Sequence, residues 1–130
     1  MARRRISAED GYAALRAAPG GGRAEKAAAV RFCLEELAER APGNSVEVRV
    51  PPFGVTQCVE GPRHTRGTPP NVVETDPQTW LELATGALSW SGAVAAGRVS
   101  ASGQRADLGA WLPLFPDVPP PAAGPPVPDR

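Results

Sequence analysis

The sequence predicts one α+β domain in which helices cover one face of a mostly antiparallel sheet. Three observations support this fold class. Apolar residues recur with a helical period in residues 23–41, and they alternate with a period of two in residues 45–50. Helical segments precede and follow the strand-like segments, and a length of 130 residues is typical of one domain.

Two helices are expected at the start of the fold. Ser7 is a suitable N-cap for the first helix, which ends before Pro19 and three glycines. The second helix spans about residues 23–41 and has one apolar side. That side consists of Ala27, Val30, Leu34, Leu37, Ala38 and Ala41. Phe32 lies on the charged side instead, so it is either partly exposed or covered by another segment.

Three short strands follow the second helix. Residues 45–50 alternate strictly between apolar and polar, as in a strand with one buried face. Two prolines end this strand, and residues 55–60 are expected to pair with it in antiparallel orientation. Residues 71–75 form a third strand, so residues 61–70 are interpreted as a long hairpin-type connection on the surface.

The second half of the chain returns to a helical pattern. Asp76 can cap a helix that begins at Pro77, and Ser89 can cap a second, shorter helix. Residues 98–102 alternate again and predict a fourth strand. Residues 106–115 are then expected to form one or two final helical turns.

The chain is expected to have three parts. Residues 1–22 form an N-terminal helix and a glycine linker, and residues 23–115 form the folded domain. Residues 116–130 contain seven prolines and are expected to form a disordered or partly polyproline II tail. This tail can bind an aromatic-lined groove of a partner, although a solvated tail without a partner is the more common case.

Charge and cysteine content exclude several classes of function. The 14 basic and 14 acidic residues give no net charge, which argues against nucleic-acid binding. The arginine-rich start leads into acidic residues, and no apolar run is long enough to span a membrane, so a cytoplasmic protein is expected. Cys33 and Cys58 are expected to be free and buried. One histidine and two separated cysteines form no metal-binding motif, and no cofactor is indicated.

A series of short motifs in residues 75–115 occurs in a specific order. They are an acidic helix start, an aromatic residue with leucines, an ATG turn, a helix ending in Gly-Arg, a strand, Ser-Gly and final leucines. The matching residues are Asp76, Trp80, Leu81, Leu83, Ala84, Thr85, Gly86, Ala93, Gly97, Arg98, Val99, Ser102, Gly103, Leu108 and Leu112. This order resembles the C-terminal half of the sterol carrier protein type 2 superfamily. Residues 45–77 resemble its bacterial branch, so the resemblance covers about residues 24–115.

The resemblance implies both a fold and a function. Members have a five-stranded sheet covered by helices, with an apolar tunnel between the two layers, and they bind fatty acyl chains, sterols or other lipids without catalysis. A sheet of about five strands is therefore expected. The residues expected to contact the lipid are Val48, Val59, Trp80, Leu83, Trp90, Val94, Trp111 and Leu114.

The only histidine lies between two arginines in the connection that follows the second strand. Arg63, His64 and Arg66 can donate hydrogen bonds to a carboxylate or phosphate, and they are candidates for binding a lipid head group. Alternatively, they pair with acidic neighbours such as Glu60 and Glu74, or they remain solvated.

We therefore expect non-catalytic binding of a lipid or other apolar molecule, a function that can extend to transfer of that molecule. One alternative is a protein-interaction module with a closed cavity that acts through the basic connection or the proline-rich tail. A second alternative is a small enzyme or enzyme subunit that uses His64. No catalytic residue is assigned, because a nucleophile such as Cys58 would need the connection to fold back before it could reach that histidine.

Overall fold

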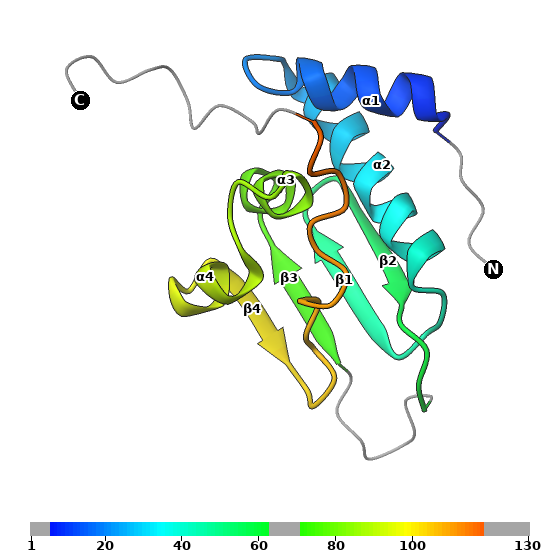
Figure 1. The fold of residues 1–130 in the computed structure, drawn as a ribbon, viewed down its shortest axis with the longest axis vertical. Coiled ribbons are helices and arrows are strands. Elements are labelled where there is room, and N and C mark those ends of the chain that lie inside the picture. The colour runs from blue at the N-terminus through cyan, green and yellow to red at the C-terminus, as the bar shows by residue number, and fades with distance from the viewer. Residues whose placement is uncertain (1–5, 63–70, 119–130) are drawn as a thin grey trace.

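A computed structural model describes residues 6–62 and 71–118. In these residues the fold consists of four helices and a four-stranded sheet (Figure 1). The helices are α1 (Ala8–Ala17), α2 (Arg23–Arg40), α3 (Pro77–Thr85) and α4 (Trp90–Ala95). Helix α1 packs on α2 and not on the sheet. The strands are β1 (Val46–Val50), β2 (Gly54–Cys58), β3 (Val72–Thr75) and β4 (Val99–Ser102).

The sheet has the order β2-β1-β3-β4. Strand β1 pairs with β2 in antiparallel orientation and with β3 in parallel orientation, and β3 pairs with β4 in antiparallel orientation. The predicted α+β class is confirmed. The sheet is mixed, however, and the described residues form four strands where about five were expected.

The expected hairpin between β2 and β3 is wrong. Val48 in the centre of β1 lies opposite Thr56 of β2 on one side and Val73 of β3 on the other. The chain therefore passes from one side of β1 to the other between these two strands. The alternation of apolar and polar residues predicts which side chains of a strand are buried. It does not predict with which other strand that strand pairs.

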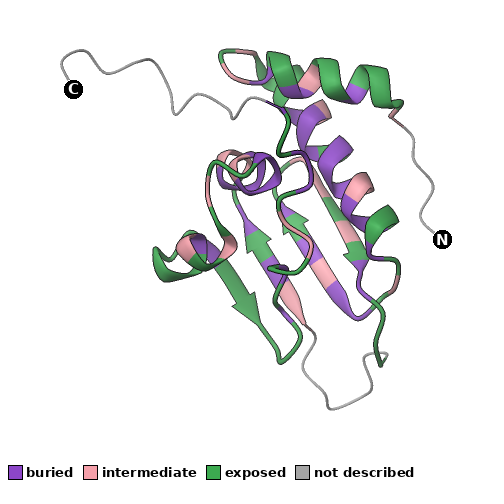
Figure 2. Ribbon diagram, viewed as in Figure 1, coloured by how far each residue is buried: buried purple, intermediate pink, exposed green. Residues whose placement is uncertain are grey.

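One face of the sheet is covered and the other is open (Figure 2). The side chains of Val46, Val48 and Val50 are fully buried under the helices. The alternate residues Glu47 and Arg49 lie on the opposite face, where they form an ion pair. This one-sided burial follows from the strict alternation in β1.

Phe32 is covered by two other segments. It is only 1% exposed, and its ring stacks on that of Phe115 at 5.2 Å and meets that of Tyr12 edge-on at 5.7 Å. Gly11 of α1 lies directly over the ring, because a Cβ atom there would be 2.2 Å from Phe32. The charged side of α2 is therefore a second packing surface, which binds α1 and the end of the described chain.

The predicted helix starts are confirmed by their caps. The Ser7 hydroxyl accepts a hydrogen bond from Asp10 N at 3.1 Å, and the Ser89 hydroxyl accepts one from Gly92 N at 3.0 Å. The carboxylate of Asp76 accepts a hydrogen bond from Thr79 N at 3.1 Å. Each bond satisfies a backbone N–H group that has no partner within its helix.

Of the one or two final helical turns expected in residues 106–115, a single turn forms. Trp111 N and Leu112 N both donate to Leu108 O, which makes a single turn. Pro113 has no N–H group with which to continue the pattern. We call residues 104–118 the C-terminal strap, which runs over the helix-covered side of the sheet toward α1 and α2 (Figure 1).

Candidate ligand-binding layer

The layer between sheet and helices is filled by apolar side chains from distant parts of the chain. Val48 of β1, Trp80 and Leu83 of α3 and Leu114 of the strap belong to one cluster. Each is at most 1% exposed. The structure therefore brings together these four of the residues predicted to bind lipid, and a fifth, Val59, belongs to the same cluster.

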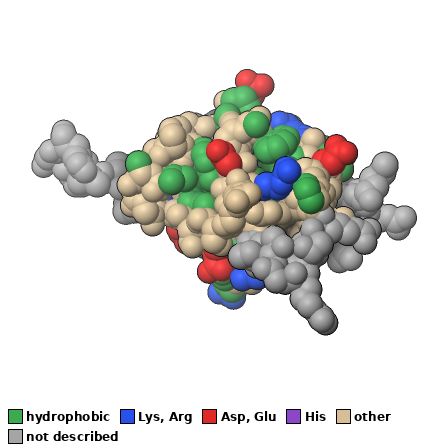
Figure 3. Space-filling view, turned by 90° about the horizontal axis from the view of Figure 1, so that it is seen from below, with side chains coloured by type: hydrophobic (Ala, Val, Ile, Leu, Met, Phe, Trp, Pro, Cys, Tyr) green, Lys and Arg blue, Asp and Glu red, His purple; other side chains and the backbone are tan. Residues whose placement is uncertain are grey.

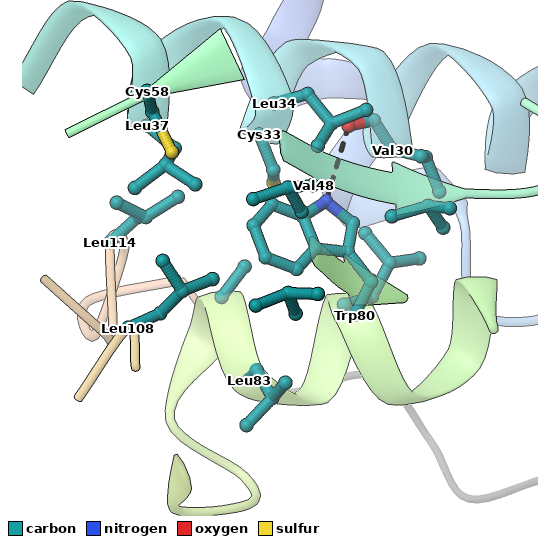
Figure 4. Packing of buried hydrophobic residues seen from close by; sticks show 14 of the residues in the cluster. Val30, Cys33, Leu34, Leu37, Val48, Cys58, Trp80, Leu83, Leu108 and Leu114 are labelled. Atoms are coloured by element: carbon teal, nitrogen blue, oxygen red, sulfur yellow. Dashed lines mark hydrogen bonds between the residues drawn. The ribbon is translucent and has the colours of Figure 1, made fainter. Parts of the chain in front are cut away.

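Trp80 connects helix α3 to helix α2. Its indole N–H donates to the main-chain oxygen of Val30 in α2 at 3.3 Å (Figure 4). Because this bond satisfies the only polar atom of the side chain, the indole can be fully buried without an unpaired donor. The layer around Trp80 is consequently apolar.

The C-terminal strap closes the layer without a helix or strand of its own. Leu114 N and Phe115 N both donate to Ala84 O of α3, at 2.9 Å and 2.8 Å. Leu108 and Leu114 reach from the strap into the core (Figure 4), where they are 0% and 1% exposed. Leu108 was not among the residues expected to contact lipid, although Leu114 of the same segment was.

The other predicted contact residues lie at the margin of the layer or outside it. Trp90 and Trp111 are partly buried and pack against the core. Val59 is 9% exposed and lies beyond the end of β2, whereas Val94 of α4 is 44% exposed. The expectation that Val94 points inward is therefore wrong, because its neighbour Ala93 occupies the buried position of that short helix.

Val59 has an unusual backbone conformation. Its φ of 67° lies in the left-handed region, which β-branched residues rarely adopt. Val59 N donates to Ala41 O at 2.7 Å, and Val59 O accepts hydrogen bonds from Ser45 N at 3.0 Å and from the Ser45 hydroxyl at 2.7 Å. These three bonds hold the turn in place. Arg63, His64 and Arg66 follow it and lie outside the described residues.

Neither cysteine has the properties of a nucleophile. Cys33 and Cys58 are free and buried, as the sequence predicted. Burial raises the pKa of Cys58 to about 12, and burial together with the nearby Glu36 carboxylate raises the pKa of Cys33 well above its usual value. Both side chains are therefore neutral thiols at pH 7, whereas a reactive cysteine has a lowered pKa.

A polar cleft of about 310 Å³ lies at the ends of β1 and β3 and the start of β4. Its lining includes Glu74, Asp76, Arg98 and Ser100. Burial raises the pKa of Asp76, but hydrogen bonds from Thr79 and the charge of Arg98 outweigh it, so the pKa of Asp76 is lower than usual. Sequence analysis missed this cleft, because its residues come from three separate segments.

The described charged side chains form no metal site, and those on the face drawn in Figure 3 form no dominant patch. In residues 6–62 and 71–118, no group of three or more His, Cys, Asp and Glu residues is placed to hold a metal ion. On the face drawn in Figure 3, acidic and basic side chains alternate with apolar groups. No helix in this part of the chain is long and apolar enough to cross a bilayer.

Comparison with known proteins agrees with this architecture. A search of curated proteins finds no match. Residues 22–114 match the sequence family described as "Bacterial SCP ortholog", where SCP denotes sterol carrier protein. The match covers most of the chain, includes every described strand and the four buried residues of the layer, and confirms the resemblance seen in the motifs. The chain belongs to the bacterial sterol carrier protein family.

Proposed function

We propose that this protein binds a lipid, sterol or fatty acyl chain between its sheet and its helices, and carries it without chemical change. Membership of the sterol carrier protein family is the observation that carries this proposal. The apolar layer supports it, because the side chains of Val48, Trp80, Leu83 and Leu114 offer only carbon and one satisfied N–H group. Such a surface can bind hydrocarbon but offers no group for catalysis.

A ligand would have to displace side chains that now fill the layer. The strap is the segment best suited to move, because it has no regular secondary structure and its two bonds to α3 share the single acceptor Ala84 O. Burial of ligand carbon stabilises the complex by about 25 cal/mol per Å². An acyl chain can therefore compensate for the loss of the buried contacts of Leu108 and Leu114.

The proposed contacts form an inner and an outer set. Val48, Trp80, Leu83 and Leu114 would contact the ligand in the interior. Trp90 and Trp111 would contact it at the margin, where their rings are partly buried. Val59, a member of the buried cluster, would contact the ligand at the end of β2, whereas Val94 would contribute only if the ligand extends beyond the layer. Arg63, His64 and Arg66, which lie outside the described residues, would bind a carboxylate or phosphate head group, because their N–H groups can donate hydrogen bonds to anionic oxygens.

Replacement of one strap side chain tests this proposal. Leu114→Ala removes buried side-chain carbon atoms from the layer. It is expected to lower the free energy of unfolding by about 2–5 kcal/mol. It should also raise the affinity for a fluorescent fatty acid about tenfold, because the ligand no longer displaces that side chain. Binding is measured by fluorescence titration, and native mass spectrometry after incubation with a lipid extract identifies what the wild type retains.

Leu15→Ala is the matched control. Leu15 is a buried leucine of α1 with 4% exposure, and it lies on a helix that covers α2 and not the sheet. This variant should lose stability without a gain in affinity. A wild-type protein that takes up no lipid, together with equal affinities in the two variants, would contradict the proposal.

A further inference from the structure

The outer edge of β4 has no partner among the described residues. β4 is the last strand in the sheet order, so no described strand lies beyond it, and α4 lies next to it (Figure 1). Its residues Ser100, Ala101 and Ser102 are all exposed. Edge strands commonly carry lysine, proline or a bulge that prevents further pairing. β4 has neither residue, and its register with β3 is continuous over all four residues.

Helix α4 extends this edge with an apolar surface. Val94 is 44% exposed, and the two alanines that follow it are exposed as well. Arg98 N donates to Ala93 O at 2.9 Å, and Arg98 O accepts a hydrogen bond from the Thr75 hydroxyl at 2.8 Å. These two hydrogen bonds fix the position of α4 relative to the start of β4. We call residues 94–96 and 100–102 the β4–α4 surface.

The β4–α4 surface carries no charge. Between residues 83 and 104 the only charged side chain is Arg98. Its guanidinium contacts the carboxylate of Glu82 at 2.8 Å and the Thr79 hydroxyl at 3.1 Å, so it is engaged with α3. A highly charged partner would find no complementary group here, whereas two copies of the surface would meet without repulsion between like charges.

We propose that the β4–α4 surface joins two copies of this chain, with their β4 strands paired in antiparallel orientation about a two-fold axis. Such pairing satisfies the outward backbone N–H and C=O groups of both strands at once. Because the axis is perpendicular to the sheet, the covered faces of the two sheets lie on the same side. Each α4 is then beside the partner's β4. This inference is independent of lipid binding.

The same surface suits other occupants less well. A bilayer cannot satisfy the backbone groups of an open strand edge. A single extended peptide can pair with β4 but brings no second helix to cover Val94. A four-residue strand and a short helix bury less than the roughly 800 Å² per partner of a standard interface. The dimer is therefore weak and forms only at high protein concentration.

Sedimentation velocity from about 5 to 500 µM tests the dimer. The wild type should change from the mass of one chain to that of two across this range. Val94→Glu should weaken the dimer at least about tenfold, because it places a charge against the partner's strand. Val55→Glu is the matched control, since Val55 is 59% exposed on β2 at the opposite edge of the sheet. Circular dichroism confirms that both variants are folded.

Hydrogen exchange locates the contact. Backbone amides of residues 99–102 should exchange more slowly at high than at low protein concentration, and those of β2 should not change. A wild type that stays monomeric throughout overturns the proposal. Equal weakening by both glutamate substitutions, or exchange in β4 that is independent of concentration, does so as well. Monomeric protein that sediments with phosphatidylcholine vesicles, but not after Val94→Glu, assigns the surface to lipid and also overturns it.

Discussion

At the scale of single residues, Val59 is the position where backbone and side-chain preferences conflict. A left-handed φ costs a residue with a Cβ atom about 1–2 kcal/mol. Val59 nevertheless keeps φ at 67°, because three hydrogen bonds to Ala41 and Ser45 and the burial of its side chain hold it there. Gly43 packs against the same turn, where a Cβ atom would be 2.2 Å from Val59 O.

Because of this conflict, the glycine variant at position 59 should be more stable than the alanine variant, which is the reverse of the usual order. A protein with glycine in the middle of a strand is normally about 0.5–1 kcal/mol less stable than the same protein with alanine there. At position 59 we expect Val59→Gly to be about 1 kcal/mol more stable than Val59→Ala, because only glycine adopts this φ without strain. Urea unfolding of both variants measures the difference. The same pair at Val55, a regular position in β2, should show the normal order. The normal order at both positions would refute a left-handed backbone at Val59.

At the scale of elements, the start of α3 connects helix, sheet and polar cleft. The Thr79 hydroxyl donates to Asp76 at 2.6 Å and accepts a hydrogen bond from Arg98 at 3.1 Å, and Arg98 reaches Glu82 farther along the helix. Thr79 is fully buried, so its hydroxyl depends on these partners. This network fixes the position of α3, the helix that contributes Trp80 to the apolar layer.

The cap of α3 should make stability depend on pH. Burial raises the pKa of Asp76, but the hydrogen bonds from Thr79 and the charge of Arg98 lower it further, so the net shift is downward. The unfolded chain therefore binds this proton more readily, and the stabilisation is present near pH 7 and lost as the pH falls through the pKa of the folded state. Asp76→Asn should lower the free energy of unfolding by up to about 1 kcal/mol at pH 7, and by less at acidic pH.

Thermal unfolding from pH 7 to about pH 3 measures this dependence. The Tm difference between wild type and Asp76→Asn should shrink as the pH falls. Asp10→Asn is the control, because Asp10 is an exposed residue in the first turn of α1, where Ser7 provides the cap. A Tm difference at position 76 that stays constant over the whole range would show that the charge of Asp76 does not stabilise α3.

At the scale of the whole molecule, the core depends on segments that are distant in sequence. Phe115 and Val118 of the strap belong to the same buried cluster as Leu15 of α1 and Val46 of β1. The two thiols lie inside this cluster, with Cys33 on α2 and Cys58 on β2. Solvent can reach them only when the packed layers open.

The thiols should therefore report global unfolding. In the folded state, we expect reaction of Cys33 and Cys58 with a disulfide reagent at pH 8 to be at least about a thousandfold slower than in urea, because the open state is rare. The absorbance of the released thiol measures the rate. An added Ser100→Cys, at an exposed position of β4, should react at once and serves as the control. Rapid reaction of either native thiol would contradict this packing and would revive the enzyme hypothesis.

Local sequence patterns were sufficient to predict several helices and strands and the family of the chain. Ser7, Asp76 and Ser89 each start a helix, because a short polar side chain satisfies a nearby N–H group whatever the rest of the fold does. Alternation in residues 46–50 determined a strand with one buried face. The order of motifs in the second half determined the family assignment, and hence the apolar layer and the burial of Trp80, Leu83 and Leu114.

Only the tertiary structure decided how these elements meet. Strand β3 pairs with β1. Phe32 is buried by α1 and Phe115, and the leucines of the strap pack into the core although the strap forms no helix. Val94 remained exposed on a helix too short for periodicity to define its buried side. These outcomes depend on contacts between residues far apart in the chain. Their energies are comparable to local preferences, so neither propensity nor spacing along the sequence could decide them.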